Sequence, residues 1–237
     1  MNELIFFLST ILFLGIVVLM YKIFGKYGLY AYVIFASILA NIAAMKTVVM
    51  FGVVTSAGSV LYASTFLCTD ILSEKHGKKS AERAVILGII ISLLWLLGTQ
   101  ITLWFTPSEN SEFISGYLST VFGMVPRLTL ASLSGYIVSQ SVDVFMYHFI
   151  WNKTGNTKKG LWLRNNGSTL TSQLFDTVIF VTIAYIGVLP TVAFFQMMIT
   201  TYLFKAIVAL FDTPFAYLAR CVNPLDLFKG EELVCQE

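Results

Sequence analysis

Long apolar runs separated by short polar stretches dominate this chain, and few folds accept such a pattern. A helix needs about 20 mostly apolar residues to cross the hydrocarbon core of a bilayer, which is about 30 Å thick. Seven runs meet this requirement, at positions 4–24, 27–51, 55–73, 81–105, 127–151, 168–189 and 191–219. We therefore expect one all-α integral membrane domain over 1–237, a bundle of about seven (six to seven) transmembrane helices.

Composition supports this expectation. Hydrophobic residues make up 57% of the chain and charged residues only 12%, against roughly a quarter charged in soluble domains. The net charge of +2 offers no basic surface for nucleic acid. Cys68, Cys221 and Cys235 lack paired spacing, and no His, Cys, Asp or Glu cluster has the spacing of a metal site. We expect no disulfide framework, no metal and no cofactor.

The basic residues predict the orientation, because Lys and Arg concentrate in cytoplasmic loops. With the N-terminus outside, the inner segments hold Lys22, Lys26, Lys75, Lys78, Lys79, Arg83, Lys153, Lys158, Lys159, Arg164, Arg220 and Lys229, and the outer ones hold none. The outer connection 106–126 carries Glu109 and Glu112 and is expected to lie on the interface as an amphipathic segment. The C-terminus is then inside, and the expected location is the bacterial inner membrane.

Charged side chains also occur within the expected spans, where each costs about 3 kcal/mol unless it is paired or shielded. They are Lys46, Arg127, Lys205, Asp70, Asp143, Asp176 and Asp212, accompanied by the amides Asn41, Gln100, Gln140, Gln173 and Gln196. An inert anchor would not carry this cost. The set indicates either a substrate path or buried ion pairs that hold helices together.

Two neighbouring spans share the element Ser-Gln-x-x-Asp. It occurs as Ser139-Gln140-x-x-Asp143 and again as Ser172-Gln173-x-x-Asp176. Since adjacent spans run antiparallel, we expect them to present two similar amide and carboxylate pairs to one cavity. We interpret the match as a chemical parallel and not as evidence of duplication.

Longer motifs carry a family resemblance. The run LWLRNNGSTLTSQLFDT at 161–177 resembles the signature of the queuosine precursor transporter family, a bacterial branch of the vitamin uptake transporters. The run Thr-Asp-x-x-x-Glu-x-x-Gly-Lys-Lys ending at Lys79 and the run Ser-Gln-x-x-Asp-Val-Phe ending at Phe145 are similar to two more of its motifs. The similarity extends over about 41–212. It implies inward movement of a 7-deazaguanine, most often 7-cyano-7-deazaguanine, for the synthesis of queuosine in tRNA.

The chemistry of such a substrate suggests binding residues. A deazaguanine presents N–H donors that a carboxylate accepts, and a carbonyl to which amides or cations donate. We expect Asp143 or Asp176 in the first role. The candidates for the second role are Asn41, Lys46, Arg127, Gln140 and Gln173, and those for stacking are Tyr62, Trp95, Trp104 and Tyr136. Trp104 and Trp151 fit membrane-interface anchors better.

A second set is expected to form gating contacts or ion pairs. Its members are Asp70, Arg164, Asn165, Asn166, Lys205 and Asp212. Our hypothesis is that the Arg-Asn-Asn segment forms an inner gate held against the acidic ends of neighbouring spans. Glu74 and the lysines after it fit an ordinary cytoplasmic loop equally well.

Three function classes compete. The first is a self-contained transporter, a facilitator or one driven by protons through an Asp. The second is the substrate-binding subunit of an energy-coupling factor importer, which needs a small-residue surface for its partner; Ala131 and Gly135 form the best pair. The third, an enzyme, lacks a Ser/His, Cys/His or metal constellation, so we expect no catalysis. The expected partners are a small-molecule substrate and the bilayer, with oligomers and an energising module left open.

Overall fold

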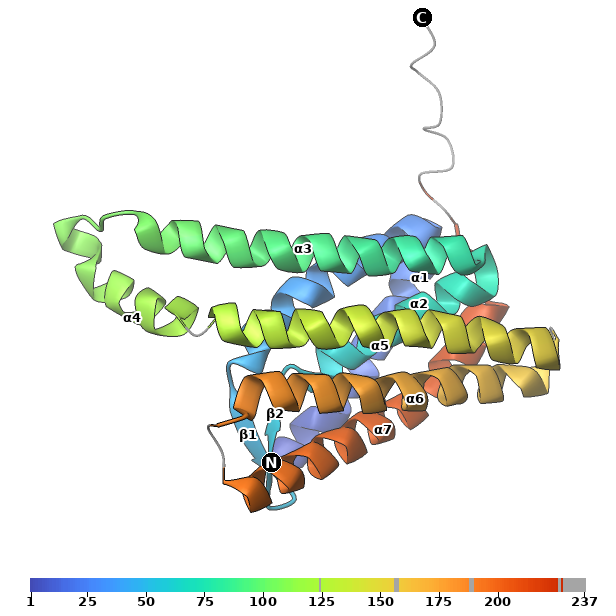
Figure 1. Cartoon of the computed structure of the whole chain (residues 1–237). Helices are drawn as coiled ribbons and strands as arrows, with labels where there is room; N and C mark the ends of the chain where they lie inside the picture. Colours follow the sequence, from blue (N-terminus) through green and yellow to red (C-terminus); the bar gives the residue numbers. More distant parts are fainter. Residues whose placement is uncertain (124, 156–157, 188–189, 226, 228–237) are drawn as a thin grey trace, which may run out of the picture.

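The computed structural model describes residues 1–123, 125–155, 158–187, 190–225 and 227; the predictions that concern positions 188–189, Lys229 and Cys235 lie outside them. The helices are α1 (Asn2–Ala44), α2 (Ser59–His76), α3 (Lys78–Trp104), α4 (Glu112–Gly123), α5 (Val125–Thr154), α6 (Lys158–Tyr185) and α7 (Thr191–Cys221). A 3₁₀ turn, η1 (Glu109–Ser111), precedes α4, and the strands β1 (Thr47–Met50) and β2 (Val53–Ser56) follow α1. The long helices lie side by side, with α4 and the strands towards one end (Figure 1).

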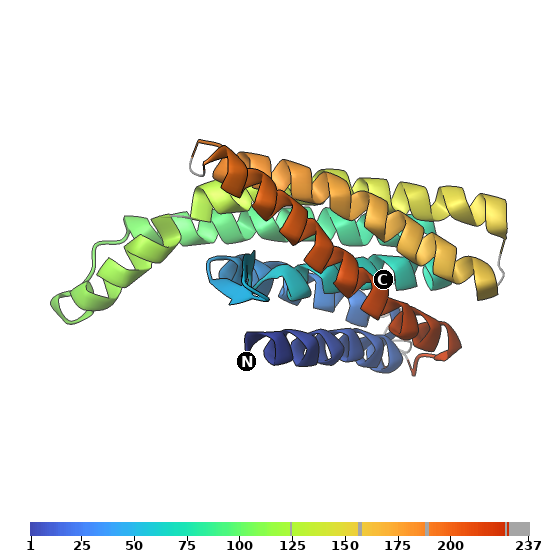
Figure 2. The ribbon, with the colours of Figure 1, turned by 90° about the horizontal axis from the view of Figure 1, so that it is seen from below.

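Helix α1 folds back on itself at Gly25. Its 43 residues would extend about 65 Å if straight, twice the thickness of a hydrocarbon core. Gly25 has φ 58° and ψ −140°, which side-chain-bearing residues avoid. The Tyr32 hydroxyl lies 3.5 Å from the Phe13 carbonyl oxygen, although a straight helix would separate these residues by about 28 Å. The two halves are therefore antiparallel (Figure 2), in agreement with the runs predicted at 4–24 and 27–51.

The expected helix over 27–51 ends early, at Ala44. A hairpin replaces its last turns and the first residues of the run predicted at 55–73, so the fold is not entirely α-helical. Thr47, Val48 and Val49 are β-branched and favour extended backbone. Gly52, at φ 77°, allows the tight turn between the strands.

The first residues of the chain form hydrogen bonds to this hairpin. Glu3 Oε1 accepts a hydrogen bond of 3.1 Å from the Phe51 amide, and Asn2 Nδ2 donates to the Val49 carbonyl over 2.8 Å. The start of α1 and the hairpin consequently lie at the same end of the bundle, which we call the hairpin end.

Helix α6 begins earlier than predicted, at Lys158 instead of 168. The Arg-Asn-Asn-Gly segment at 164–167 is helical, because its polar side chains have buried partners within the bundle. The expected amphipathic segment over 106–126 contains α4, which has no buried residues; its place on the membrane interface stays a prediction.

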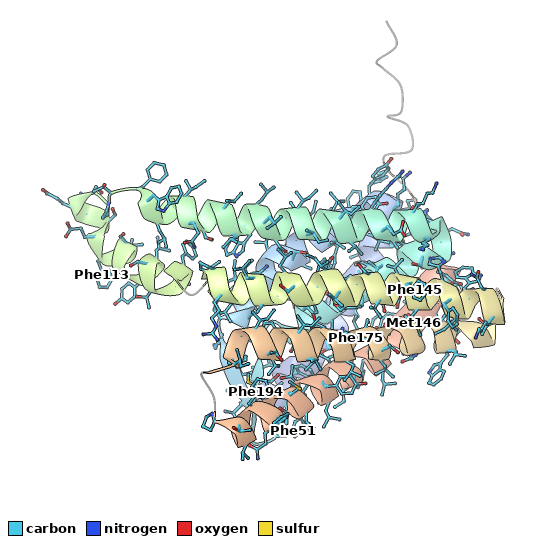
Figure 3. The ribbon with its side chains drawn as sticks, viewed as in Figure 1. Phe51, Phe113, Phe145, Met146, Phe175 and Phe194 are labelled. Carbon is cyan, nitrogen blue, oxygen red and sulfur yellow. The ribbon has the colours of Figure 1, made fainter. Side chains whose placement is uncertain are left out.

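Polar and apolar side chains are distributed as expected for a protein surrounded by lipid. Within the described residues, four stretches are long and apolar enough to cross a membrane: α1, α3, Glu109–Thr154 and α7. On the outside, apolar side chains such as Phe145, which is 59% exposed, and Phe175 point away from the bundle (Figure 3). Inside, Gln140 and Asp143 are completely buried. The number of crossings and the orientation of the termini stay predictions.

The basic loops meet at one end of the bundle, opposite the hairpin end. Lys75 Nζ donates to the Arg220 carbonyl over 2.5 Å, and the Leu225 amide donates to the Lys22 carbonyl over 2.8 Å. The Gly25 turn, the α2–α3 turn and the end of α7 therefore lie together. We call this the basic end; it gathers segments that the sequence predicts to share one side of the membrane.

The fold-back at Gly25 predicts the effect of adding a side chain there. Gly25→Ala is expected to lower the free energy of unfolding by about 1–3 kcal/mol, because alanine is strained in this conformation. Gly98→Ala is the matched control, since Gly98 lies within α3 and an added Cβ would meet nothing within 4 Å. Thermal unfolding in detergent measures both; equal transition temperatures would contradict the role given to Gly25.

Candidate functional site

One face of α6 carries a column of buried polar side chains. Asp176, Gln173, Thr169 and Asn165 follow one another at helical spacing, and none is more than 2% exposed. Residues of α2, α5 and α7 join this column. Together they form, from the hairpin end to the basic end, a pocket, a group of carboxylates and an ion-pair network.

The pocket contains the carboxylate of Asp176. Lys205 of α7 forms an ion pair with Asp176 Oδ2. Tyr62 of α2 donates to Asp176 Oδ1 over 2.6 Å, and Ser139 of α5 donates to the same atom over 3.4 Å. Lys205 Nζ also lies 5.2 Å from the centre of the Tyr62 ring, within range of a cation–π contact. Four helices thus converge on one compensated carboxylate.

The pocket holds about 740 Å³ of non-atom space, part of which is open to solvent. It extends from the hairpin end to the Asp176–Lys205 pair. Its walls combine small, hydroxyl-bearing and aromatic side chains: Ala36, Ser37, Ala40, Asn41, Ala44, Thr55, Ser56, Gly58, Ser59, Tyr62, Thr65, Ser92, Ser132, Tyr136, Asp176, Phe180, Thr201 and Lys205. A concave, mostly apolar wall with a few buried polar groups is typical of small-molecule sites.

Several predicted residues meet in this pocket. Asn41 lines it and donates to its own helix, at the Ser37 carbonyl, over 2.8 Å. Tyr62 and Tyr136, which we expected to stack on a substrate, face each other edge to face at 5.9 Å. Lys205, expected in a gating contact, lines the pocket as well.

Other predicted residues lie elsewhere. Lys46 and Arg127 are exposed and do not line the pocket. Arg127 donates to the carbonyls of Ile183 and Ile186, over 3.4 and 3.1 Å, which satisfies the last turn of α6. Trp104 is 80% exposed, as expected of an interface anchor.

The two Ser-Gln-x-x-Asp elements contact each other reciprocally. Ser139 of α5 donates to Asp176 of α6, and Ser172 of α6 donates to Asp143 of α5 over 3.2 Å. The expectation that both carboxylates line one cavity is wrong, because an antiparallel pair offsets them by about one turn. Asp176 lines the pocket, whereas Asp143 is completely buried beyond it.

The glutamines of these elements differ. Gln140 Nε2 donates to Thr65 over 3.3 Å, and its Oε1 accepts from Thr69 over 3.2 Å. Gln173 is completely buried, and within the described residues neither of its side-chain polar atoms has a hydrogen-bond partner. Gln173 is therefore the amide that can still take a new partner between the pocket and the carboxylates beyond it.

Close packing of α5 on α6 depends on Gly135. A Cβ added there would lie 2.6 Å from Asp176 Oδ1. Ala131 and Gly135 are both buried. The small-residue pair that we considered as a surface for a partner is thus used, at Gly135, inside this chain.

Three carboxylates lie beyond the pocket, Asp70 of α2, Asp143 of α5 and Asp212 of α7, which we call the carboxylate cluster. Thr169 lies 3.5 Å from Asp70 Oδ2, and Asn165 Nδ2 donates to Asp212 Oδ1 over 2.7 Å. Among the described residues, none of the three forms an ion pair with a lysine or arginine, and no group of His, Cys, Asp and Glu is placed to bind a metal.

A network at the basic end, which we call the latch, consists of Glu74, Tyr147, Arg164 and Arg220. Arg164 donates to both oxygens of Glu74, from Nε over 2.9 Å and from Nη2 over 2.6 Å. Tyr147 donates to Glu74 over 2.7 Å, and Arg220 Nε lies 3.5 Å from it. The Arg164 guanidinium also lies 4.6 Å from the centre of the Trp151 ring. A bidentate, buried pair of this kind is geometrically specific.

The sequence did not single out Glu74 or Tyr147 as functional. Glu74 fitted an ordinary loop charge, yet its side chain is only 7% exposed. Two features of the sequence could have indicated these residues. Glu74 lies in the motif ending at Lys79, and Tyr147 follows Asp143 by one helical turn. Asn166, expected beside Arg164 and Asn165, donates to Thr213 of α7 over 2.7 Å and so ties α6 to α7.

Comparisons with known proteins agree with one another. Residues 56–219 match the family model described as "Putative vitamin uptake transporter". A protein of Bacillus subtilis (strain 168) named "Probable queuosine precursor transporter" is 42% identical over 211 residues, which cover 89% of this chain and 91% of the relative. No solved structure gives a significant match.

The geometry predicts that Lys205 and Asp176 depend on each other for stability. Lys205→Met is expected to cost about 3 kcal/mol or more, because it leaves a buried carboxylate without its cation. Adding Asp176→Asn should recover more than half of this loss. Thermal unfolding of the single and double variants measures the coupling. The control is Lys78→Met, which breaks the exposed pair with Glu82 at 3.6 Å and should change stability by at most about 0.5 kcal/mol. Equal losses of stability in Lys205→Met and Lys78→Met would contradict the prediction.

Proposed function

The chain belongs to the vitamin uptake transporter family, and from this premise we propose that it imports a queuosine precursor, 7-cyano-7-deazaguanine or a related 7-deazaguanine, for the modification of tRNA. It is a multi-pass membrane transport protein and not an enzyme. The name of the Bacillus subtilis relative supports the substrate class. The bacterial inner membrane is the location that this function requires.

One observation carries the proposal: the pocket combines a buried carboxylate, a buried ammonium group and two tyrosine rings. Asp176 accepts N–H groups from the edge of the deazaguanine, in place of the Tyr62 and Ser139 hydroxyls that it now accepts from. Lys205 donates to the carbonyl oxygen on the same edge. The rings of Tyr62 and Tyr136 supply faces on which a flat bicyclic base stacks.

The arrangement of the two ends supports a self-contained transporter. We propose seven crossings with the N-terminus outside, which place the hairpin end on the outer face and the basic end in the cytoplasm. The pocket then opens outward while the latch closes the cytoplasmic side. Transport requires the latch to open after the substrate has bound, as in other carriers whose site lies between alternating gates.

The alternative is the substrate-binding subunit of an energy-coupling factor importer. A pocket near the outer face is also what that function expects. Against it, Gly135 of the small-residue pair already packs on Asp176 within this chain. Uptake by the protein alone distinguishes the two functions.

The substrate proposal predicts uptake of labelled 7-cyano-7-deazaguanine by cells that lack their own transporter and produce this protein. Asp176→Asn should lower uptake at least tenfold, because it removes a charged hydrogen-bond acceptor worth about 1.5–3 kcal/mol. Glu109→Gln, at an exposed position, should leave uptake intact. Inserted wild-type protein that takes up no label would overturn the self-contained function; uptake that then appears on adding an energising module would favour the alternative.

The latch proposal predicts that weakening Glu74 opens the cytoplasmic side more often. In a variant whose three cysteines are replaced by serine, Ser168→Cys reports access to a site that is buried beside the latch. Glu74→Gln should raise its labelling from the cytoplasmic face about fivefold or more, and Tyr147→Phe should raise it by less, because it removes only one hydrogen bond.

Inside-out vesicles and a membrane-impermeant thiol reagent measure this labelling. Glu82→Gln is the matched control, because it breaks an exposed ion pair at the same end. Unchanged labelling in both latch variants would contradict a gating role.

A further inference from the structure

The carboxylate cluster lies between the pocket and the latch, and the ion pairs described above do not account for it. Asp70, Asp143 and Asp212 come from three different helices, and none is more than 2% exposed. Carboxylates in such surroundings are costly unless cations or hydrogen-bond donors compensate them. Asp176 has Lys205 for this purpose, whereas the cluster has no ion pair within the described residues.

Hydrogen-bond donors are too few as well. The side chains that donate to the cluster are Thr169, Ser172 and Asn165. Ser168, on the same helix, donates to the backbone of Asn165 over 3.1 Å and also lies within hydrogen-bonding reach of Asp143. Asp143 Oδ2 and the side-chain oxygen of Asn165 are buried without any donor in the part of the chain described. The three carboxylates, with two oxygens each, therefore offer more acceptor oxygens than these side chains offer donors.

Asp70 and Asp143 accept from hydroxyls about one turn apart on α6, those of Thr169 and Ser172, which brings the two carboxyl groups close enough to share a hydrogen bond. Two ionised carboxylates in contact repel each other strongly in a buried site, but one proton held between them turns the repulsion into attraction. The geometry thus favours a state in which the pair holds one proton.

The other charged and titratable groups around the pair do not replace this proton. From α2 these are Cys68 and Glu74, from α6 Arg164 and Asp176, from α7 Asp212 and Lys205, and from α5 Tyr147 and His148. Both nearby cations are engaged: Arg164 with Glu74, and Lys205 with Asp176. On α3, Lys78, Lys79, Glu82 and Arg83 are exposed.

We propose that Asp70 and Asp143 together bind the proton whose inward movement drives substrate uptake, an inference that rests on the proposed function. The proton comes from water on the outer side and is released to water in the cytoplasm, and no other bond is made or broken. The reciprocal contacts of α5 and α6 link this step to the substrate, because Ser172 bonds Asp143 and Asp176 lies one turn further along the same helix. Ionisation of the pair after release changes the contact that fixes α6 against α5.

Two transport measurements on purified protein in liposomes test this assignment. Exchange of labelled for unlabelled 7-cyano-7-deazaguanine needs no net movement of protons, whereas accumulation against a concentration gradient needs their energy. With the outside about one pH unit more acidic, one proton per substrate supports about tenfold accumulation. Asp143→Asn and Asp70→Asn should each abolish accumulation while exchange persists, because Asn cannot release a proton.

Two further variants separate the outcomes. Asp176→Asn should lose both exchange and accumulation, and Glu112→Gln, at an exposed position, should keep both. Absence of exchange by the wild type would contradict the proposed function itself. Three other outcomes would overturn only the proton assignment. The wild type could show exchange without accumulation, accumulation could persist in both Asp143→Asn and Asp70→Asn, or accumulation could follow a sodium gradient instead.

Infrared difference spectra provide a readout that is independent of transport. Between acidic and alkaline buffer, the wild type should show the carbonyl band of a protonated carboxyl group, and Asp143→Asn and Asp70→Asn should each lose it. A band that persists in both variants would also overturn the assignment.

Discussion

Charge buried in a bundle with an apolar exterior must be compensated from within, and this constraint determines the arrangement of the interior. The protein satisfies it differently at three depths. At the pocket, Lys205 compensates Asp176. At the basic end, Arg164 compensates Glu74 through two hydrogen bonds. Between them, the carboxylate cluster has only hydroxyl and amide donors among the described residues. Each arrangement suits a different role. A charge with a fixed partner favours substrate binding, a bidentate ion pair favours closure of a gate, and a carboxylate without a cation favours binding of a proton.

The antiparallel contact of α5 and α6 connects these depths. Each helix donates a serine hydroxyl to the aspartate of the other, and Gly135 lets the two backbones approach closely enough for this to occur. In the proposed mechanism, a change at Asp143 reaches the helix that carries Asp176 and, further along the same helix, Arg164. The polar column of α6 provides a physical route between the pocket, the cluster and the latch.

Much of the fold followed from the sequence, because long apolar runs in lipid have one stable backbone arrangement, the helix. The fold-back at Gly25 was also predicted, as a break between two runs, since a single helix of that length exceeds the bilayer. The hairpin was missed: its β-branched residues are as hydrophobic as a span, and hydrophobicity alone does not distinguish strand from helix. The sequence did not decide the role of Arg127 for a related reason, because an arginine at the edge of a span has the same sequence context whether it binds a substrate or, as its contacts here indicate, caps a helix.

The sequence by itself determined the membrane class, most of the helical segments, the gathering of basic loops at one end and most of the residues from which the site is built, Glu74 and Tyr147 excepted. These properties depend on the order of apolar and charged residues along the chain, which folding does not alter. Only the tertiary structure decided which charges meet: Lys205 with Asp176 instead of Asp212 on its own helix, and Glu74 with Arg164. Such pairings depend on the offset and rotation of neighbouring helices, which side-chain packing sets and linear spacing does not encode.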